Sequence, residues 1–278
     1  MNMPALVVPP ETPTPLPEDD PTGAATATIK ERGLAGYISP FKVDLEAVRS
    51  AKTPDSSSSY QPVPHGDLYD RVRIELEWAG IGITEEMHSL YRGGDRYIGL
   101  AITDLKSPQN DAEVVVGWFN SHDHSHAATL LLGERVMVCF NLSLHAEIKV
   151  CRRHTKHIRR DLPGLVAHAV DRVRGRVDEH GDRMDRYRAV ELPERGAHHL
   201  VVRLVEDGAL PAGSLKPVLR EWRQPSHPEF AEAWNVNRLY QAVTGQRAPL
   251  SQMALRHRSL HRVMDEWCDE REGNARRA

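Results

Sequence analysis

The sequence predicts an α+β fold, with a mainly antiparallel sheet of four to five strands packed with helices and followed by a helical C-terminal region. Strand-like apolar runs separated by glycine turns lie between residues 84 and 140. Apolar residues at helical spacing follow residue 141, and proline is concentrated at the start of the chain. We therefore expect an arm over 1–64, an α+β core domain over 65–185 and a helical region over 186–278.

The first 64 residues contain 11 of the 19 prolines, together with Thr-rich and Ser-rich runs. Such a segment buries too little apolar surface to offset the entropy of ordering, so a mostly disordered Pro/Ser/Thr-rich arm is expected. Residues 37–48 are the one piece of the arm that is expected to dock on the folded part. The sequence leaves open whether the arm binds a partner.

The core domain is expected to begin with a helix and a hairpin. Asp67 is a suitable cap for a helix that ends at Gly80. Strands over 84–92 and 96–105 flank two consecutive glycines, which tolerate the positive φ of a tight turn. Further strands are expected over 111–119 and 127–140, the latter bent at Gly133.

After residue 141 the pattern predicts helices only. Pro163 is expected to end one helix and Asp161 to cap the next, while the charge-dense segment 175–185 is expected to be a connection. Further helices are expected over 195–205, 217–222, 229–243 and 251–269. Two apolar stripes are expected to pack together, Trp234, Leu239, Tyr240 and Val243 on one helix and Leu255, Leu260, Val263, Met264 and Trp267 on the other.

The net charge of -3 argues against indiscriminate attraction to nucleic acid. Between Glu147 and Arg176, however, nine Lys or Arg residues stand against three acidic ones, so an anionic partner is expected to bind there. Three cysteines without a Cys-x-x-Cys pair, and no apolar stretch long enough to span a membrane, favour a soluble cytoplasmic protein.

A polar motif follows the expected strand over 111–119. It comprises Asn120, Ser121, His122, Asp123 and Ser125, and it is followed by Val138, Cys139, Asn141, Arg153, His154 and Thr155. In order and spacing this stretch, about 117–160, resembles the phage/plasmid-like family catalogued as domain of unknown function 932, and residues 234–244 resemble that family more weakly. The resemblance implies an association with phages or plasmids and implies no activity.

The motif is the candidate polar site, formed by Asn120, Ser121, His122, Asp123, Asn141, His154 and Thr155. Asn120 and Ser121 are expected to satisfy backbone groups at a turn. His122 is a candidate general base or phosphate contact and Asp123 a candidate Mg²⁺ ligand, but neighbours in a strand point to opposite faces. The natural partner for either is therefore His154.

Three histidines alternate at positions 122, 124 and 126, and in an extended strand they would share one face. Such a set can bind a divalent metal, although short histidine tracts are more often solvated loop residues. His124 and His126 also depart from the family pattern, so no metal or other cofactor is expected.

A basic helix is expected to follow the sheet. The residues predicted to bind nucleic acid are Arg152, Arg153, Lys156, Arg159 and Arg160. Spacings of three and four residues place most of them on one helical face that can follow a phosphate backbone, the alternative being an ordinary solvated face. Because 141–186 contains no Phe, Tyr or Trp, binding is expected to be mainly to the backbone rather than by base stacking.

The favoured hypothesis is a DNA-binding accessory protein of phage- or plasmid-type mobile elements, similar in layout to single-strand-annealing proteins and able to form homo-oligomers. One alternative is a metal-dependent hydrolase or nuclease that uses His122, Asp123 and His154. Another is a non-catalytic interaction or structural module. Common catalytic motifs are absent from the sequence, which favours a protein that is not an enzyme.

Overall fold

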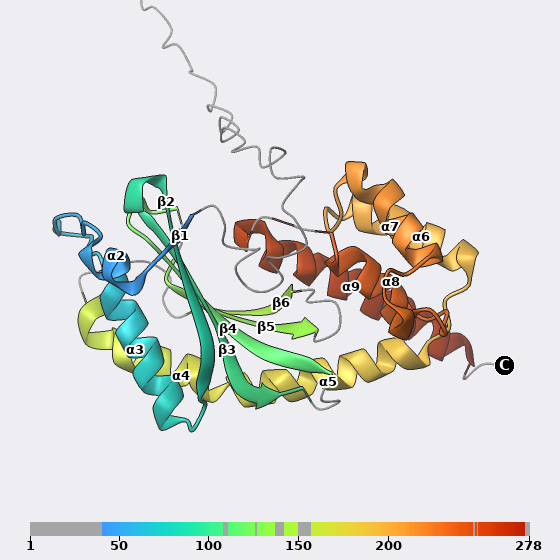
Figure 1. Cartoon of the computed structure of the whole chain (residues 1–278), viewed down its shortest axis with the longest axis horizontal. Helices are drawn as coiled ribbons and strands as arrows, with labels where there is room; N and C mark the ends of the chain where they lie inside the picture. Colours follow the sequence, from blue (N-terminus) through green and yellow to red (C-terminus); the bar gives the residue numbers. More distant parts are fainter. Residues whose placement is uncertain are drawn as a thin grey trace, which may run out of the picture. The chain divides into compact units, whose positions relative to one another are not determined.

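The computed structural model describes residues 41–107, 111–125, 127–136, 142–149, 157–246, 248 and 250–275. Six strands form one antiparallel sheet in which each strand pairs with its neighbour in sequence (Figure 1). They are β1 (Lys42–Val43), β2 (Ile83–Tyr91), β3 (Arg96–Lys106), β4 (Ala112–Ser121), β5 (Thr129–Val136) and β6 (Leu142–Lys149). Because β1 has two residues, the sheet has five long strands, and the predicted α+β fold with a helical C-terminal region is confirmed.

Two helices precede the five long strands in the described chain, and the other helices follow them. The helices are α2 (Leu45–Ser50), α3 (His65–Trp78), α4 (Ile158–Asp171), α5 (Val173–Ala189), α6 (Glu194–Glu206), α7 (Leu215–Arg223), α8 (Val236–Thr244) and α9 (Leu250–Ala275), with short 3₁₀ turns η2 (Arg92–Gly94), η3 (Ala212–Ser214) and η4 (Pro228–Phe230). The predicted hairpin is present, and Gly93 and Gly94 take positive φ between β2 and β3. Of the helices described, none combines the length and the apolar character that crossing a membrane requires.

The long strands bury side chains on both faces of the sheet. Tyr97 and Trp118 lie on one face, in a cluster with the buried side of α3 and α4, which lie side by side (Figure 1). Leu100 and Leu131 lie on the opposite face, in a second cluster with Met253 of α9. Successive residues of a strand point to opposite faces, so strand alternation assigns each apolar residue to one of the two clusters.

A third apolar cluster lies within the helical region. Its buried side chains come from α5 to α9, and Trp222 and Leu239 are completely buried in it. Arg238 crosses this cluster and donates hydrogen bonds to the carbonyl oxygens of Trp222, Arg223 and Ala231. The predicted contact between the last two helices is present in most positions, but Trp234 and Leu255 are 46% and 64% exposed.

Residues 41–64 belong to the folded part, so the predicted arm over 1–64 extends too far. Asp44 caps α2 by accepting a hydrogen bond from the backbone of Ala47. Val48 and Val63 are each 1% exposed in the first cluster. These buried residues, the pairing of β1 with β2 and the packing of Val43 and Leu45 dock this segment despite its polar composition. Residues 1–40 lie outside the described part of the chain.

Three predicted helix starts are wrong, and one of them is that of the helix expected over 229–243, which begins at Val236 with Asn235 as its cap. α3 begins at His65 after Pro64, so Asp67 lies in its first turn and is not its cap. α4 runs from Ile158 to Asp171 through Pro163, so Asp161 does not start a new helix there. Pro163 removes one backbone hydrogen bond near the start of α4, and the apolar stripe that α4 buries against α3 outweighs this loss.

Two segments were assigned to the wrong state. Residues 142–149 form the edge strand β6, although helices only were expected after residue 141, and their strict alternation of apolar and polar residues is a strand signal. Residues 175–185 lie inside α5 and are not a connection. Their buried side chains, such as Val177, His180 and Met184, recur every three or four residues within a charge-dense sequence.

Gly99 allows the close approach of β3 to Trp118 of β4. A Cβ atom at position 99 would lie 2.2 Å from the Trp118 ring, so Gly99→Ala should lower the free energy of unfolding by about 1–3 kcal/mol. Gly164→Ala is the control, because its Cβ in α4 would meet nothing within 4 Å and should stabilise the helix by about 0.5–1 kcal/mol. Urea unfolding measures both, and equal effects would contradict the packing role of Gly99.

Candidate functional site

The polar motif forms a buried corner after β4. Asn120 is 1% exposed, and its amide donates to the carbonyl oxygen of Val63 at 2.8 Å and pairs with the Nδ1 atom of His65 at 2.9 Å. His122 is 4% exposed, lies 2.9 Å from the same Val63 oxygen through Nε2, and stacks on His65 with ring centroids 4.0 Å apart. Tyr60 donates to the carbonyl oxygen of His122. These contacts bind the segment before α3 to the end of β4.

Asp123 closes the turn on the outside of this corner. It accepts hydrogen bonds from the backbone and hydroxyl of Ser125 and forms an ion pair with Arg96 at 2.6 Å. Partial burial acts to raise the pKa of Asp123, but the hydrogen bonds from Ser125 and Arg96 prevail and lower it to about 2. Asp123 therefore stays ionised and engaged within the fold, and its carboxylate serves the turn.

The structure contradicts the expected strand of alternating histidines. β4 ends at Ser121, and residues 122–125 form a bend in which His124 takes a φ of 60°. His122 points inward to Val63, whereas His124 lies against the ring of Tyr60, so these two imidazoles do not share a face. His126 lies outside the described residues, and among those that are described no three His, Cys, Asp or Glu side chains are arranged to hold a metal ion.

The remaining predicted residues are only partly described. Ser121 is buried, and Arg159 and Arg160 are exposed in the first turn of α4. Six further predicted residues lie outside the described part of the chain, namely Asn141, Arg152, Arg153, His154, Thr155 and Lys156. A cleft shared by His122, Asp123 and His154 therefore stays a prediction, and the two described members of that set point to different partners.

A second polar cluster lies between β5, α5 and α9, and the sequence patterns did not predict it. Glu134 of β5 places its Oε2 atom 3.4 Å from Nε2 of His180 in α5. The ring of His180 stands at 81° to that of His261, with centroids 5.3 Å apart, and His257 lies one turn away on α9. All four residues are between 1% and 6% exposed. The spacing of His257 and His261 by four residues is the one signal of this cluster in the sequence.

Burial controls the ionisation of this Glu/His cluster. Burial, reinforced by the charge of Asp111 and opposed by Arg188, raises the pKa of Glu134 to about 8. Burial also lowers the pKa of His180 to about 3 and of His257 to about 4, with nearby positive charges adding to both shifts. The cluster is therefore neutral near pH 7, because the carboxyl group is protonated and the imidazoles are not.

A chain of hydrogen bonds holds the cluster at its helical side. Tyr187 donates to Asp265 at 2.8 Å and lies 3.4 Å from Nδ1 of His261, while Arg183 donates to Asp265 at 3.2 Å. The network connects α5 to α9 through four side chains. It can keep the imidazole of His261 in one orientation, and it joins two helices beside the buried Glu/His cluster.

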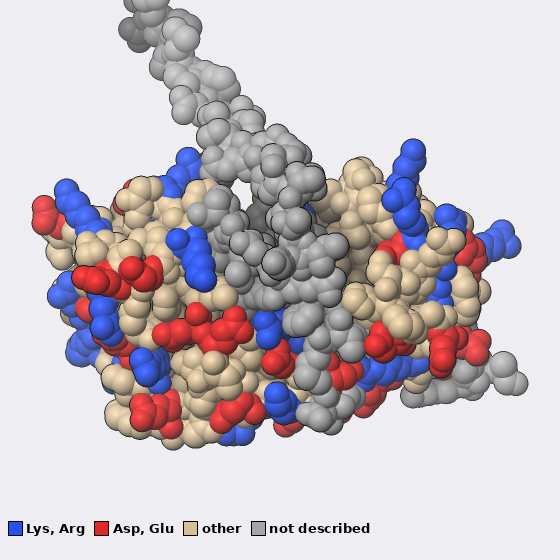
Figure 2. Space-filling view, viewed as in Figure 1, with Lys and Arg blue, Asp and Glu red and all other residues tan. Residues whose placement is uncertain are grey.

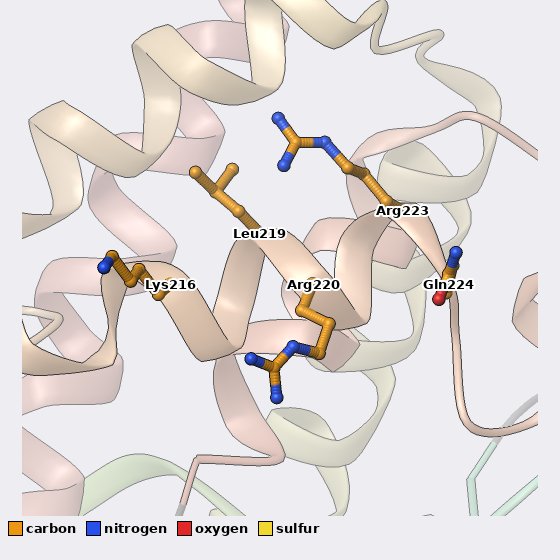
Figure 3. Close-up of a pocket in the computed structure, with 5 residues that line it drawn as sticks. All are labelled: Lys216, Leu219, Arg220, Arg223 and Gln224. Carbon is orange, nitrogen blue, oxygen red and sulfur yellow. The ribbon is translucent and has the colours of Figure 1, made fainter.

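A shallow basic hollow of about 350 Å³ lies on α7. Its lining residues are Lys216, Leu219, Arg220, Arg223 and Gln224. Figure 3 shows Arg220 pointing away from the side taken by Leu219 and Arg223, so the positive charges do not converge. Arg223 is also held by Glu194 of α6 at 2.8 Å. This geometry does not define a binding site for a compact ligand.

The corner at residues 120–123 should behave as a structural element. His122→Ala removes the contact with Val63 and the stack on His65, so it should lower the free energy of unfolding by about 2–4 kcal/mol. His124→Gly is the matched control and should change stability by less than about 0.5 kcal/mol, because glycine tolerates the positive φ at this exposed position. Thermal and urea unfolding compare them. A variant at position 122 as stable as the wild type would contradict this role.

The raised pKa of Glu134 makes stability depend on pH in a defined direction. Its pKa lies above the ordinary value of 4.5, so its contribution is complete below about pH 4.5 and is lost as the pH rises through about 8. Glu134→Gln keeps the neutral form and should raise the free energy of unfolding above pH 8 by a few kcal/mol, on the order of the cost of ionising a buried carboxyl.

Urea unfolding followed at pH values from 5 to 9 tests this expectation, since the difference between Glu134→Gln and wild type should grow with pH. Glu206→Gln changes an exposed carboxylate of α6 and is the control. It should change the free energy of unfolding by the same small amount at every pH. A constant difference for the Glu134 variant would show that this carboxyl is ionised in the fold.

Comparisons of the chain with protein-family models, with curated proteins and with solved structures found no match. The resemblance carried by residues 117–160 therefore stays a prediction, and several of its positions lie outside the described residues.

Proposed function

We propose that this chain binds nucleic acid through its phosphate backbone, using the basic segment that follows the sheet. The proposal rests on one observation. Within residues 157–177 there are five arginines and two aspartates, and this described part follows the basic residues predicted over 152–156. A role as an accessory protein of phage or plasmid elements, acting on DNA in the manner of annealing proteins, rests on the sequence resemblance alone.

The exposed arginines of α4 and early α5 support this proposal. Arg160 has a side chain that is 75% exposed, although Asp161 forms an ion pair with it. Arg159 and Arg172 are exposed and have no ion pair within the described part of the chain. Guanidinium groups without a carboxylate partner are available to phosphate oxygens, with which they form strong bidentate hydrogen bonds.

The rest of the described surface favours a local mode of binding. On the face shown in Figure 2, positive and negative side chains are interspersed. With a net charge of -3, the whole molecule does not attract polyanions, so affinity must come from a defined basic segment. Few phosphate contacts and a clear dependence on salt are the expected properties of such a site.

The test is binding to single- and double-stranded oligonucleotides, measured by fluorescence anisotropy over a series of salt concentrations. The double variant Arg159→Gln/Arg160→Gln should weaken binding to every sequence. It should also reduce the slope of log affinity against log salt by about 1–2, because binding releases fewer counterions when two phosphate contacts are lost. Both residues are exposed, so the fold should be unaffected.

The matched control removes the same charge elsewhere. Lys52→Gln/Lys106→Gln changes two exposed lysines that lie outside the basic segment, and it should leave the salt slope as in the wild type. Equal losses in the two double variants would indicate a general charge effect. Wild-type protein that shows no salt-sensitive binding would refute the proposed function.

A further inference from the structure

We propose that Trp78 is a stacking platform for an unpaired base of single-stranded nucleic acid, an inference that rests on the proposed function and names its substrate class. Trp78 is the last residue of α3 and is 73% exposed. It is the most exposed of the five tryptophans, since Trp118, Trp222 and Trp267 are at most 5% exposed and Trp234 is 46% exposed. Tryptophan is highly buried on average, so this exposure calls for a reason.

The ring of Trp78 is oriented by its own helix. The guanidinium carbon of Arg71 lies 5.3 Å from the ring centroid, and Arg71 forms an ion pair with the buried Glu75. Ile74, one turn before Trp78, is 38% exposed on the same side of α3. A fixed aromatic ring with an apolar neighbour and a cation is the arrangement on which bases stack.

The fold brings the basic segment to this ring. Arg174 of α5 donates hydrogen bonds to the carbonyl oxygens of Ala79 at 3.3 Å and Gly80 at 3.2 Å, the two residues that follow Trp78. A cation at the end of a helix is favourable because the last carbonyl groups of α3 carry partial negative charge. Arg174 is itself exposed, so a cation lies next to the chain segment that carries the exposed ring of Trp78.

Charge selects nucleic acid over an apolar protein partner as the occupant. Two arginines lie at this end of α3, Arg71 over the ring of Trp78 and Arg174 of α5 against the two residues that follow it. The two acidic residues nearest in sequence do not oppose this charge. The buried Glu75 is paired with Arg71, and Glu77 lies on another side of α3, because adjacent residues of a helix do not share a face. Duplex bases are stacked on one another, so a single strand is the form that can use the ring.

The test compares a short oligodeoxythymidine with an abasic strand of the same length at one moderate salt concentration. Trp78→Ala should lower affinity for oligodeoxythymidine about tenfold or more and leave affinity for the abasic strand unchanged, because only the stacking contact is lost. Trp78→Phe should recover most of the affinity, since a smaller aromatic face remains. Leu255→Ala, which removes an exposed apolar side chain of α9, should bind as the wild type does.

The outcomes separate this inference from the proposed function. Salt-sensitive binding of both strands by wild type, with equal affinities for Trp78→Ala, would overturn the stacking role and leave phosphate binding standing. Binding of neither strand by wild type would overturn both. If Trp78→Ala instead abolished a self-association seen by light scattering and left strand affinity unchanged, the ring would belong to a contact with a second copy of the chain, and the inference would fail.

Discussion

The sheet carries apolar side chains on both faces, and the rest of the fold depends on covering both. In β3 and β4, neighbouring residues such as Val115 and Val116 are completely buried, one in each face cluster. A sheet of this kind cannot leave one face in water, because each exposed aliphatic side chain forgoes roughly 1.5–3 kcal/mol of burial. The chain therefore needs helices on two sides, α3 and α4 on one and α9 on the other.

Because both faces of the sheet must be covered, the C-terminal helical region is part of the core of the fold. Met253 of α9 is 2% exposed and packs on the face of the sheet that carries Leu100 and Leu131. Leu260 and Val263 of the same helix are buried among the other helices. One long helix thus belongs to two cores. Glu134, His180 and His261 lie along the same junction, so burial of polar groups accompanies the joining of the two cores, and their neutral forms limit its cost.

The sequence patterns predicted the elements that depend on interactions between residues close in the chain. The hairpin around Gly93, the strands before residue 137 and helices α6, α7 and α9 follow from alternation, helical spacing and turn glycines. β6 was missed because its alternation is short and lies next to a basic stretch, and α5 was missed because its buried stripe is embedded in charge. For the candidate site, the turn role of Asn120 was predictable from its residue type, whereas the carbonyl of Val63 that it binds comes from a distant segment.

A contact with a distant segment also bears on the expectation that binding is mainly to the backbone and not by base stacking. Residues 141–186 contain no Phe, Tyr or Trp, but Arg174 donates hydrogen bonds to the carbonyl oxygens at the end of α3, and so Trp78 becomes a spatial neighbour of that segment. Electrostatic attraction alone is a weak basis for binding in a chain with a net charge of -3, and it falls steeply with salt. Stacking depends far less on salt, so an aromatic ring beside a short basic segment can supply affinity where phosphate contacts are few. For the proposed site, this combination of stacking and phosphate contacts favours a single strand over a duplex, because only unpaired bases can reach the ring.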